Sequence, residues 1–192
     1  MIRKYLLIAS GKSAKQFYDY PYREKGWKII AINNVFQYLD VAEYDQLIHA
    51  PDMRNKVGHI PGHKTFLLQG PSFMKKWGGA NVAGRGIVIT SAYYVMDTYK
   101  PDMIGFLGCD MNYTPDPDTG NTCIYGIGDD IKIKKQSDPD RILSFMKDPN
   151  FFTKTFKLFE ETADCEVYNF SNDPKTRLPF LQVDPIDIDR DE

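Results

Sequence analysis

The sequence has few of the features that mark extracellular, zinc-binding or membrane-spanning proteins. Its three cysteines, Cys109, Cys123 and Cys165, are an odd number at wide spacing, so neither a disulfide framework nor a zinc site is indicated. No stretch approaches the roughly 18 apolar residues of a membrane-spanning helix. The apolar run from Tyr5 to Ala9 is too short for a signal-peptide core. We therefore expect a cytoplasmic protein with no integral membrane segment.

An excess of charge of either sign is also lacking. The chain has 24 Lys and Arg residues against 26 Asp and Glu residues, for a formal net charge of −2. This balance gives no electrostatic reason to expect a nucleic-acid partner or an anionic membrane. Aromatic residues, in contrast, make up 14% of the 192 residues. They favour an aromatic-rich core, with some tyrosines lining a pocket as the alternative, and they are compatible with a homo-oligomer.

Short apolar runs alternate with helical patterns along the chain. This order predicts an α/β fold, Rossmann-like, with a mostly parallel central sheet and helices on both faces. We expect a single Rossmann-like domain over residues 1–183 and a flexible acidic tail over 184–192. Strands are expected over residues 5–9, 27–32, 44–49, 64–69, 103–107 and 166–170. Helices are expected to begin near residues 14, 90, 139 and 149.

The stretch from Gly86 to Asp110 is the most informative one. Thr90 and Ser91 are suited to cap a helix, because a hydroxyl accepts a hydrogen bond from a free backbone N–H. The next turns place Ala92, Val95, Met96 and Tyr99 on one face, and Pro101 ends the helix. In a second helix, Phe152, Phe156 and Phe159 have core spacing.

Polar residues follow five of the six expected strands. The carboxyl ends of parallel strands meet at one edge of a sheet, where a ligand crevice usually lies. This pattern predicts a small, polar, nucleotide-like ligand, although Asn33 and Asn34 also suit an ordinary turn. The residues at the strand ends are Ser10, Gly11 and Ser13, Asn33 and Asn34, His49, Gly108 and Asp110, and Ser171 to Asp173.

Two more familiar kinds of site are not supported by the spacing. Gly11-Lys12-Ser13 matches the end of a phosphate-binding P-loop, but Leu6 stands where the first glycine belongs, so the loop is too short to wrap a triphosphate. His59 and His63 flank Pro61-Gly62, so no helix presents them together to a metal. Asp116 and Asp118 lie in a Pro-rich stretch that favours an exposed turn. We expect no metal and no cofactor.

Four landmarks taken together resemble a known family. They are Leu7–Ser13, Ile32–Phe36, Ile89–Tyr93 and Phe106–Asp110. Their order and spacing are similar to those of bacterial sialyltransferase-like glycosyltransferases that use CMP-sialic acid, over roughly residues 5 to 180. The resemblance implies a CMP-sugar as donor substrate, a glycan or small-molecule acceptor with a hydroxyl group, and inversion at the anomeric carbon.

The same resemblance implies roles for individual residues. Ser10, Gly11 and Ser13 match the first loop, which lies by the donor's phosphate and sugar. Asn34 matches the asparagine that ends the second strand and contacts the nucleotide sugar, and Thr90, Ser91 and Ala92 match a Thr-Ser-Gly turn that helps hold the nucleotide. Asp110 matches an aspartate near the ribose or base, and Tyr113 and Tyr125 match two tyrosines that bind the departing phosphate, where phenol donors stabilise the developing charge.

The sequence departs from the family pattern at three points. Ala92 replaces the turn's glycine, and Asn112 stands in the place of the first tyrosine, one residue before Tyr113. The family's general base is a histidine beyond the aromatic loop, and this chain has no histidine after His63. The candidates to replace it are His49, Asp129 and Asp130.

Three functions therefore remain open. The first is a glycosyltransferase that binds a nucleotide sugar, most simply a CMP-sugar. The second is a catalytically inactive nucleotide-binding module, which the missing histidine favours. The third is a diphosphate-transfer enzyme on the same scaffold, which would need the carboxylates of Asp110, Asp116 and Asp118 to bind a metal.

Overall fold

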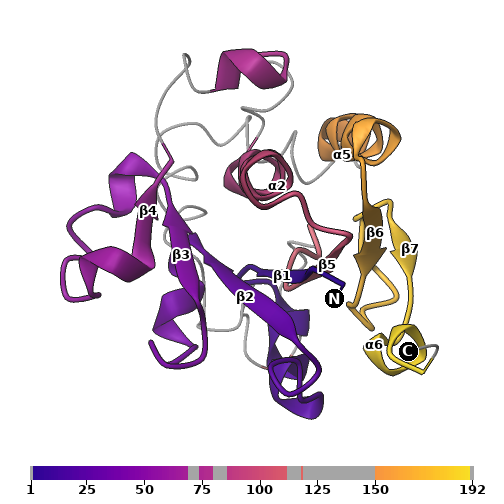
Figure 1. Ribbon diagram of the computed structural model, residues 1–192, viewed down its shortest axis with the longest axis horizontal. Helices are drawn as coiled ribbons and strands as arrows, with labels where there is room; N and C mark the ends of the chain where they lie inside the picture. The colour runs from indigo at the N-terminus through magenta and orange to yellow at the C-terminus, as the bar shows by residue number, and fades with distance from the viewer. Residues whose placement is uncertain (1, 69–73, 80–85, 112–117, 119–149, 191–192) are drawn as a thin grey trace.

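One parallel sheet carries strands from both ends of the chain (Figure 1). The computed structural model describes residues 2–68, 74–79, 86–111, 118 and 150–190. Within them, seven strands form a sheet in the order β4-β3-β2-β1-β5-β6-β7, and every neighbouring pair is parallel. The expected α/β, Rossmann-like fold is confirmed.

The strands follow the apolar runs closely. Two were predicted with both ends correct, and four others differ by one or two residues at an end. The seventh was not predicted, because it has only two residues and both are exposed. The strands are β1 (Lys4–Ile8), β2 (Trp27–Ile32), β3 (Gln46–His49), β4 (Thr65–Leu67), β5 (Met103–Leu107), β6 (Glu166–Asn169) and β7 (Leu181–Gln182).

Alternate residues of the strands enter two separate cores, one on each face of the sheet. Leu7 and Ile30 pack with the helices α2 (Ile87–Tyr99) and α5 (Asn150–Thr162). Leu6 and Ile29 pack on the other face with short 3-10 helices. The 3-10 helices are η1 (Lys12–Asp19), η2 (Asn33–Gln37), η3 (Pro51–Met53), η4 (Gly62–Lys64) and η5 (Lys75–Trp77). Residues of η1, η2 and η3 belong to this second core, whereas Trp77 of η5 packs against the first.

Aromatic rings fill much of the core beneath α2 and α5. Phe156 and Phe159 are buried, as their spacing predicted, and both meet Phe106 edge to face. Phe180 joins the same group of rings. The side chain of Phe152 and the helix expected from residue 139 lie outside the described residues.

Helix α2 begins earlier than expected, which changes the role of two residues. Thr90 and Ser91 do not cap it. Instead, the Thr90 hydroxyl donates to the Gly86 carbonyl at 2.9 Å and the Ser91 hydroxyl to the Ile87 carbonyl at 2.7 Å, as they do inside a helix. The apolar residues Ile87, Val88 and Ile89 extend the helix backward by one turn. The end of the helix is as predicted, with Lys100 in the left-handed conformation before Pro101.

In residues 184–190, where the sequence predicted a flexible tail, side chains pack against the rest of the chain. Asp184 caps the short helix α6 (Pro185–Ile188) by accepting a hydrogen bond from the Ile186 N–H at 3.0 Å. The Asp189 side chain is only 4% exposed and pairs with Lys4 of β1 at 2.9 Å. Asp189 also accepts hydrogen bonds from Tyr20 and from the Trp27 indole. An acidic composition suggested solvation, but these partners come from the opposite end of the chain.

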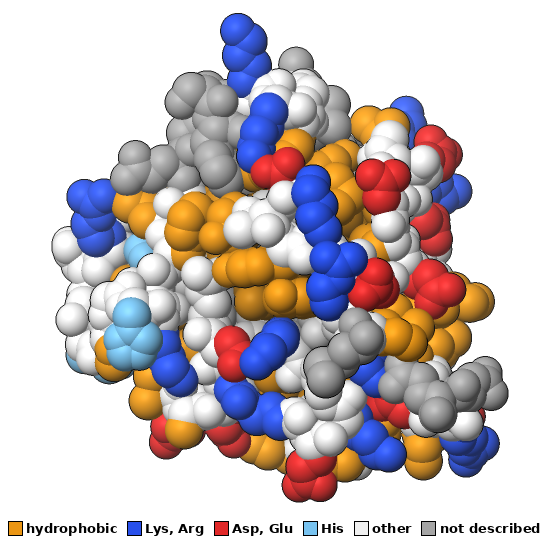
Figure 2. Space-filling model, viewed as in Figure 1, with side chains coloured by type: hydrophobic (Ala, Val, Ile, Leu, Met, Phe, Trp, Pro, Cys, Tyr) orange, Lys and Arg blue, Asp and Glu red, His pale blue; other side chains and the backbone are white. Residues whose placement is uncertain are grey.

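The molecular surface has no dominant charge. On the face in Figure 2, basic and acidic side chains are interspersed, as expected for a net charge of −2. No helix in the described part of the chain is long and apolar enough to cross a membrane.

Candidate functional site

The order in which strands are added to the sheet reverses between β1 and β5. Strands β2 to β4 lie on one side of β1, and β5 to β7 lie on the other. This is the topological switch point at which open parallel sheets usually bind ligands, outside the carboxyl ends of the strands. Polar residues from the sequence pattern gather at this edge, but the structure gives them different roles.

The two loops at the switch point touch each other through their backbones. The Gly11 N–H donates to the Gly108 carbonyl at 2.7 Å. Gly108 has φ +66°, and a Cβ atom there would lie 2.1 Å from the Ala9 carbonyl oxygen. A Cβ atom on Gly11 would lie 2.5 Å from the carboxylate of Asp110. Both glycines are therefore required by the close approach of the loops.

Asp110 is the centre of this contact. Its side chain is buried, with 2% of the residue exposed. One carboxylate oxygen accepts from the Ser13 N–H at 2.9 Å, and the other accepts from the hydroxyls of Ser13 and Ser171, the latter at 2.8 Å. The Ser13 hydroxyl in turn accepts from the Gly108 N–H at 2.9 Å. Asp110 thus joins the ends of β1, β5 and β6, and we name this set of contacts the Asp110 hub.

The hub changes the interpretation of the first loop. The start of η1 has backbone N–H groups that would suit a phosphate, but the carboxylate of Asp110 already accepts from the Ser13 N–H. A phosphate beside it would meet a negative charge at close range. Ser13 and Asp110 therefore hold the loops together, whereas the resemblance implied contacts with the donor. Ser10, which is partly exposed, has no described hydrogen-bond partner.

Three polar residues lie at the carboxyl ends of β2 and β3. The side-chain oxygen of Asn33 accepts from the Ala50 N–H at 2.9 Å, and so ties the end of β2 to the end of β3. Asn34 and His49 are both 4% exposed. Asn34 accepts from the Gln37 amide at 3.1 Å, and its own NH₂ group has no hydrogen-bond partner among the described residues.

His49 has one nitrogen engaged and one without a partner. Its Nδ1 lies 3.0 Å from the carbonyl oxygen of Ala50. Because a carbonyl can only accept, Nδ1 carries a proton, and in the neutral ring Nε2 has the lone pair. Within the described part of the chain, Nε2 has no hydrogen-bond partner. Buried polar groups are nearly always paired, so the NH₂ group of Asn34 and the Nε2 of His49 require an explanation.

The N-terminus of α2 lies at the same edge of the sheet. Only residues 100–102 separate α2 from β5, so the helix runs antiparallel to that strand and begins where the strand ends. Among the residues that the structure describes, no side chain caps the helix at Gly86. Thr90, Ser91 and Ala92 are buried within the helix, and the two hydroxyls bond helix carbonyls. Any contribution of α2 to anion binding therefore comes from its backbone N–H groups and its dipole.

Several predicted site residues are not described by the structure. Asn112, Tyr113, Tyr125 and Asp130 lie outside the described residues, as does Asp116. Asp118 is exposed. Among the described residues, no three His, Cys, Asp or Glu side chains are grouped so that they would hold a metal ion.

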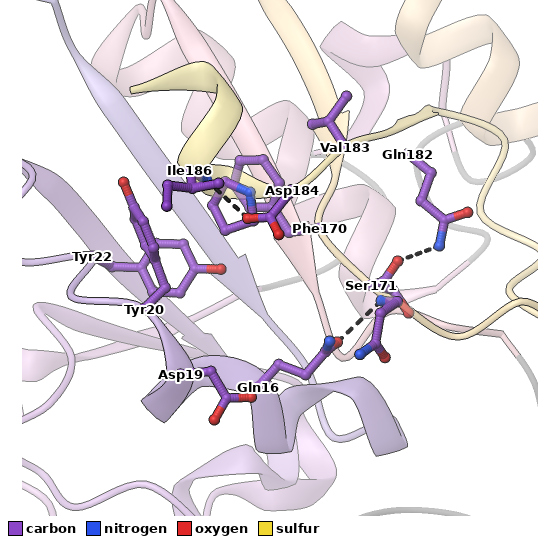
Figure 3. Close-up of a pocket in the computed structure, with 12 residues that line it drawn as sticks. Gln16, Asp19, Tyr20, Tyr22, Phe170, Ser171, Gln182, Val183, Asp184 and Ile186 are labelled. Carbon is purple, nitrogen blue, oxygen red and sulfur yellow. Dashed lines mark hydrogen bonds between the residues drawn. The ribbon is translucent and has the colours of Figure 1, made fainter. Parts of the chain in front are cut away.

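A cavity beside the Asp110 hub was missed by the sequence patterns (Figure 3). It has a volume of about 570 Å³ and is lined by η1 and the residues after it, by the residues that follow β6, and by β7 with the start of α6. Ser171 lines it and also bonds Asp110. The Asn172 N–H donates to the Gln16 side chain at 3.1 Å across its floor. Only the position of Ser171 to Asp173 after a strand hinted at this cavity, because its other wall is the segment that we expected to be flexible.

Searches of protein-family models, curated proteins and solved structures found no match to this chain. The fold is accordingly assigned from the order and direction of its strands.

Proposed function

We propose that the protein binds a nucleotide sugar, of the CMP-sugar type, at the carboxyl edge of the sheet and transfers the sugar to a hydroxyl acceptor with inversion. The observation that carries this proposal is the pair of buried groups on Asn34 and His49 that have no hydrogen-bond partner among the described residues. They follow neighbouring strands and lie at the edge that holds the topological switch point. An amide donor and an imidazole acceptor suit the hydroxyl and carbonyl groups of a nucleoside or sugar.

The phosphate has a different place in this proposal from the one that the resemblance implied. The start of η1 is occupied by Asp110, so the phosphate is assigned to the uncapped N-terminus of α2. A helix N-terminus offers free backbone N–H groups and the positive end of the helix dipole. Asn34 then contacts the nucleotide sugar, as the resemblance implies.

His49 is assigned as the proton acceptor in the transfer. The acceptor oxygen attacks the anomeric carbon while the bond from that carbon to the phosphate oxygen breaks, and the phosphate leaves with the bonding electrons. The proton of the attacking hydroxyl passes to Nε2, whose lone pair is fixed by the hydrogen bond from Nδ1 to the Ala50 carbonyl. Tyr113 and Tyr125 remain predicted donors to the departing phosphate.

A binding module without transferase activity is the second candidate. The absence of any histidine beyond His63 favours it, because the family's base has no counterpart at its usual place. Both candidates predict nucleotide binding, and only the transferase predicts turnover of the donor.

The test combines binding with turnover. Thermal unfolding is measured with CMP, CDP, and ATP with Mg²⁺; we expect stabilisation by the cytidine nucleotides alone, and no response to any of them refutes both candidates. Release of CMP from a CMP-sugar is then measured for the wild type and for His49→Gln. A general base contributes about 10²–10⁴-fold, so the variant should lose that factor while still binding CMP.

His63→Gln is the matched control, because His63 is exposed in η4. Equal CMP release by the wild type and His49→Gln removes His49 from the mechanism. No release by the wild type, despite CMP binding, favours the binding module.

A further inference from the structure

We propose that the cavity beside the Asp110 hub is a binding site for a small organic ammonium ion, such as a primary alkylamine. This ligand pocket is separate from the nucleotide crevice and does not depend on the proposed transferase activity. It is formed by residues 16–22, 170–172 and 182–186. Its volume of about 570 Å³ exceeds that of a single alkylamine and is within the range of small-molecule sites.

The charge of the lining selects a cation. Asp19 and Asp184 contribute two carboxylates, and none of the 12 lining residues is Lys, Arg or His. One oxygen of Asp184 accepts from the Ile186 N–H, which leaves its other oxygen available. Asp19 has no hydrogen-bond or ion-pair partner among the described residues. An anion such as a phosphate or a carboxylate would be repelled by both groups, whereas a cation would be attracted by both.

Tyr22 supplies the second observation. The residue is only 2% exposed, and its hydroxyl has no hydrogen-bond partner in the described part of the chain. Figure 3 shows this hydroxyl directed toward the middle of the pocket. The Tyr20 hydroxyl donates to Asp189 instead. A buried phenol without a partner is uncommon, because each unsatisfied polar group costs free energy. The position of the Tyr22 hydroxyl indicates that a ligand in the pocket is its hydrogen-bond partner.

The protonation state of Tyr22 also suits an ammonium ligand. Burial, together with Tyr20 and the nearby carboxylates of Asp184, Asp189 and Asp19, raises its pKa above the usual range. At neutral pH the phenol is therefore protonated, and its oxygen keeps lone pairs that accept from an N–H group. An ammonium has three N–H donors, and the pocket provides acceptors on Asp19, Asp184 and Tyr22.

The remaining lining matches an alkyl chain. Val183 and Pro185 are partly exposed on the wall formed by β7 and α6. The ring of Phe170 also lines the pocket, and Tyr22 packs against it with ring centroids 6.1 Å apart. Methylene groups that follow the ammonium would bury apolar surface here. The amides of Gln16 and Gln182 are already bonded to backbone atoms, as the dashed lines in Figure 3 show.

The experiment compares ligands of one shape and different charge. Amide chemical shifts of the full-length protein are followed by NMR during titration with 1,4-diaminobutane, 1,4-butanediol or succinate at low ionic strength. We expect saturable shifts at residues 171–172 and 183–187 with the diamine only. Binding should weaken as salt rises to 0.15 M, because exposed charges are screened. Equal binding of the diol, or no saturable shift with the diamine, overturns the proposal.

Three variants separate the pocket from general effects. Asp184→Asn removes the charge but keeps a residue that caps α6, and should weaken diamine binding by up to about fivefold. Tyr22→Phe keeps the ring and should weaken diamine binding by about two- to tenfold. Asp187→Asn, on the same helix as Ile186 but outside the pocket, should leave diamine binding unchanged. Wild-type affinity in both Asp184→Asn and Tyr22→Phe refutes the assignment, whatever the outcome with CMP.

Discussion

Replacing Asp110 with asparagine tests the hub most severely. The carboxylate accepts from the Ser13 N–H at 2.9 Å, from the Ser13 hydroxyl and from the Ser171 hydroxyl at 2.8 Å, with 2% of the residue exposed. Asparagine has nearly the same shape, but one acceptor oxygen becomes an NH₂ donor. If that group faces the Ser13 N–H, two donors confront each other in a buried site. If it faces the hydroxyls, two charge-assisted bonds are lost instead.

The expected cost follows from these contacts. A hydrogen bond to a charged group contributes about 1.5–3 kcal/mol, and a buried donor left without a partner costs about 1–3 kcal/mol. We therefore expect Asp110→Asn to lower the free energy of unfolding by about 3 kcal/mol. Unfolding by urea, followed through tryptophan fluorescence, measures it directly, because Trp27 is buried with 2% exposed.

Asp102→Asn is the matched control for this change. Asp102 also bonds several groups of one partner, Arg3, but its side chain is 45% exposed. Exposed ion pairs contribute little to stability, so this variant should lose much less than Asp110→Asn. If Asp110→Asn costs no more than Asp102→Asn, Asp110 does not hold the loops together, and the reassignment of the phosphate to α2 loses its basis.

Two further predictions concern the loops and the C-terminal segment. Gly108→Ala should cost about 3 kcal/mol or more in urea unfolding, because its Cβ atom would lie 2.1 Å from the Ala9 carbonyl, whereas Gly26→Ala, at φ +82° with nothing within 4 Å, should cost only about 1–2 kcal/mol of backbone strain. Equal costs would refute the close approach of the loops. Asp189→Asn should cost about 3–5 kcal/mol at pH 7, because it breaks a buried ion pair with Lys4. Burial alone would raise the pKa of Asp189, but the hydrogen bonds from Tyr20 and Lys4 outweigh it, and the pKa lies below the ordinary 3.8. The carboxylate therefore stabilises the fold above pH 3.8 and loses this effect as the pH falls through its lowered pKa, so the difference between wild type and variant should shrink there. A difference that is independent of pH down to pH 3 would contradict this account.

The sequence was sufficient for the fold because the buried strands are continuous apolar runs. The run from Trp27 to Ile32 and the run from Met103 to Leu107 were predicted with both ends correct. β7 was missed, because two exposed residues have no hydrophobic pattern and pair with β6 only after the chain has returned. The start of α2 was displaced, because Thr90 and Ser91 have hydroxyls that serve equally well at a cap or inside a helix.

The candidate site could be located from the sequence, but its contacts could not. The rule that parallel strands present their carboxyl ends at one edge was enough to bring Ser13, Asn34, His49 and Asp110 there. What the sequence did not indicate is that Asp110 bonds Ser13 across 97 positions and Ser171 across 61. Such pairs depend on the final packing. The pocket around Tyr22 was hidden for the same reason, since one wall is the acidic C-terminal segment that packs against η1 and β1.

The most direct test of the central claim is the side-chain ¹⁵N NMR signal of His49 during titration with CMP. The chain has three histidines, so the spectrum is simple, and the exposed His63 is an internal reference. We predict that CMP shifts the Nε2 signal of His49 in a saturable manner and leaves the signals of His63 in place. If millimolar CMP leaves His49 unchanged, or moves His63 to the same extent, the carboxyl edge of the sheet is not the nucleotide site.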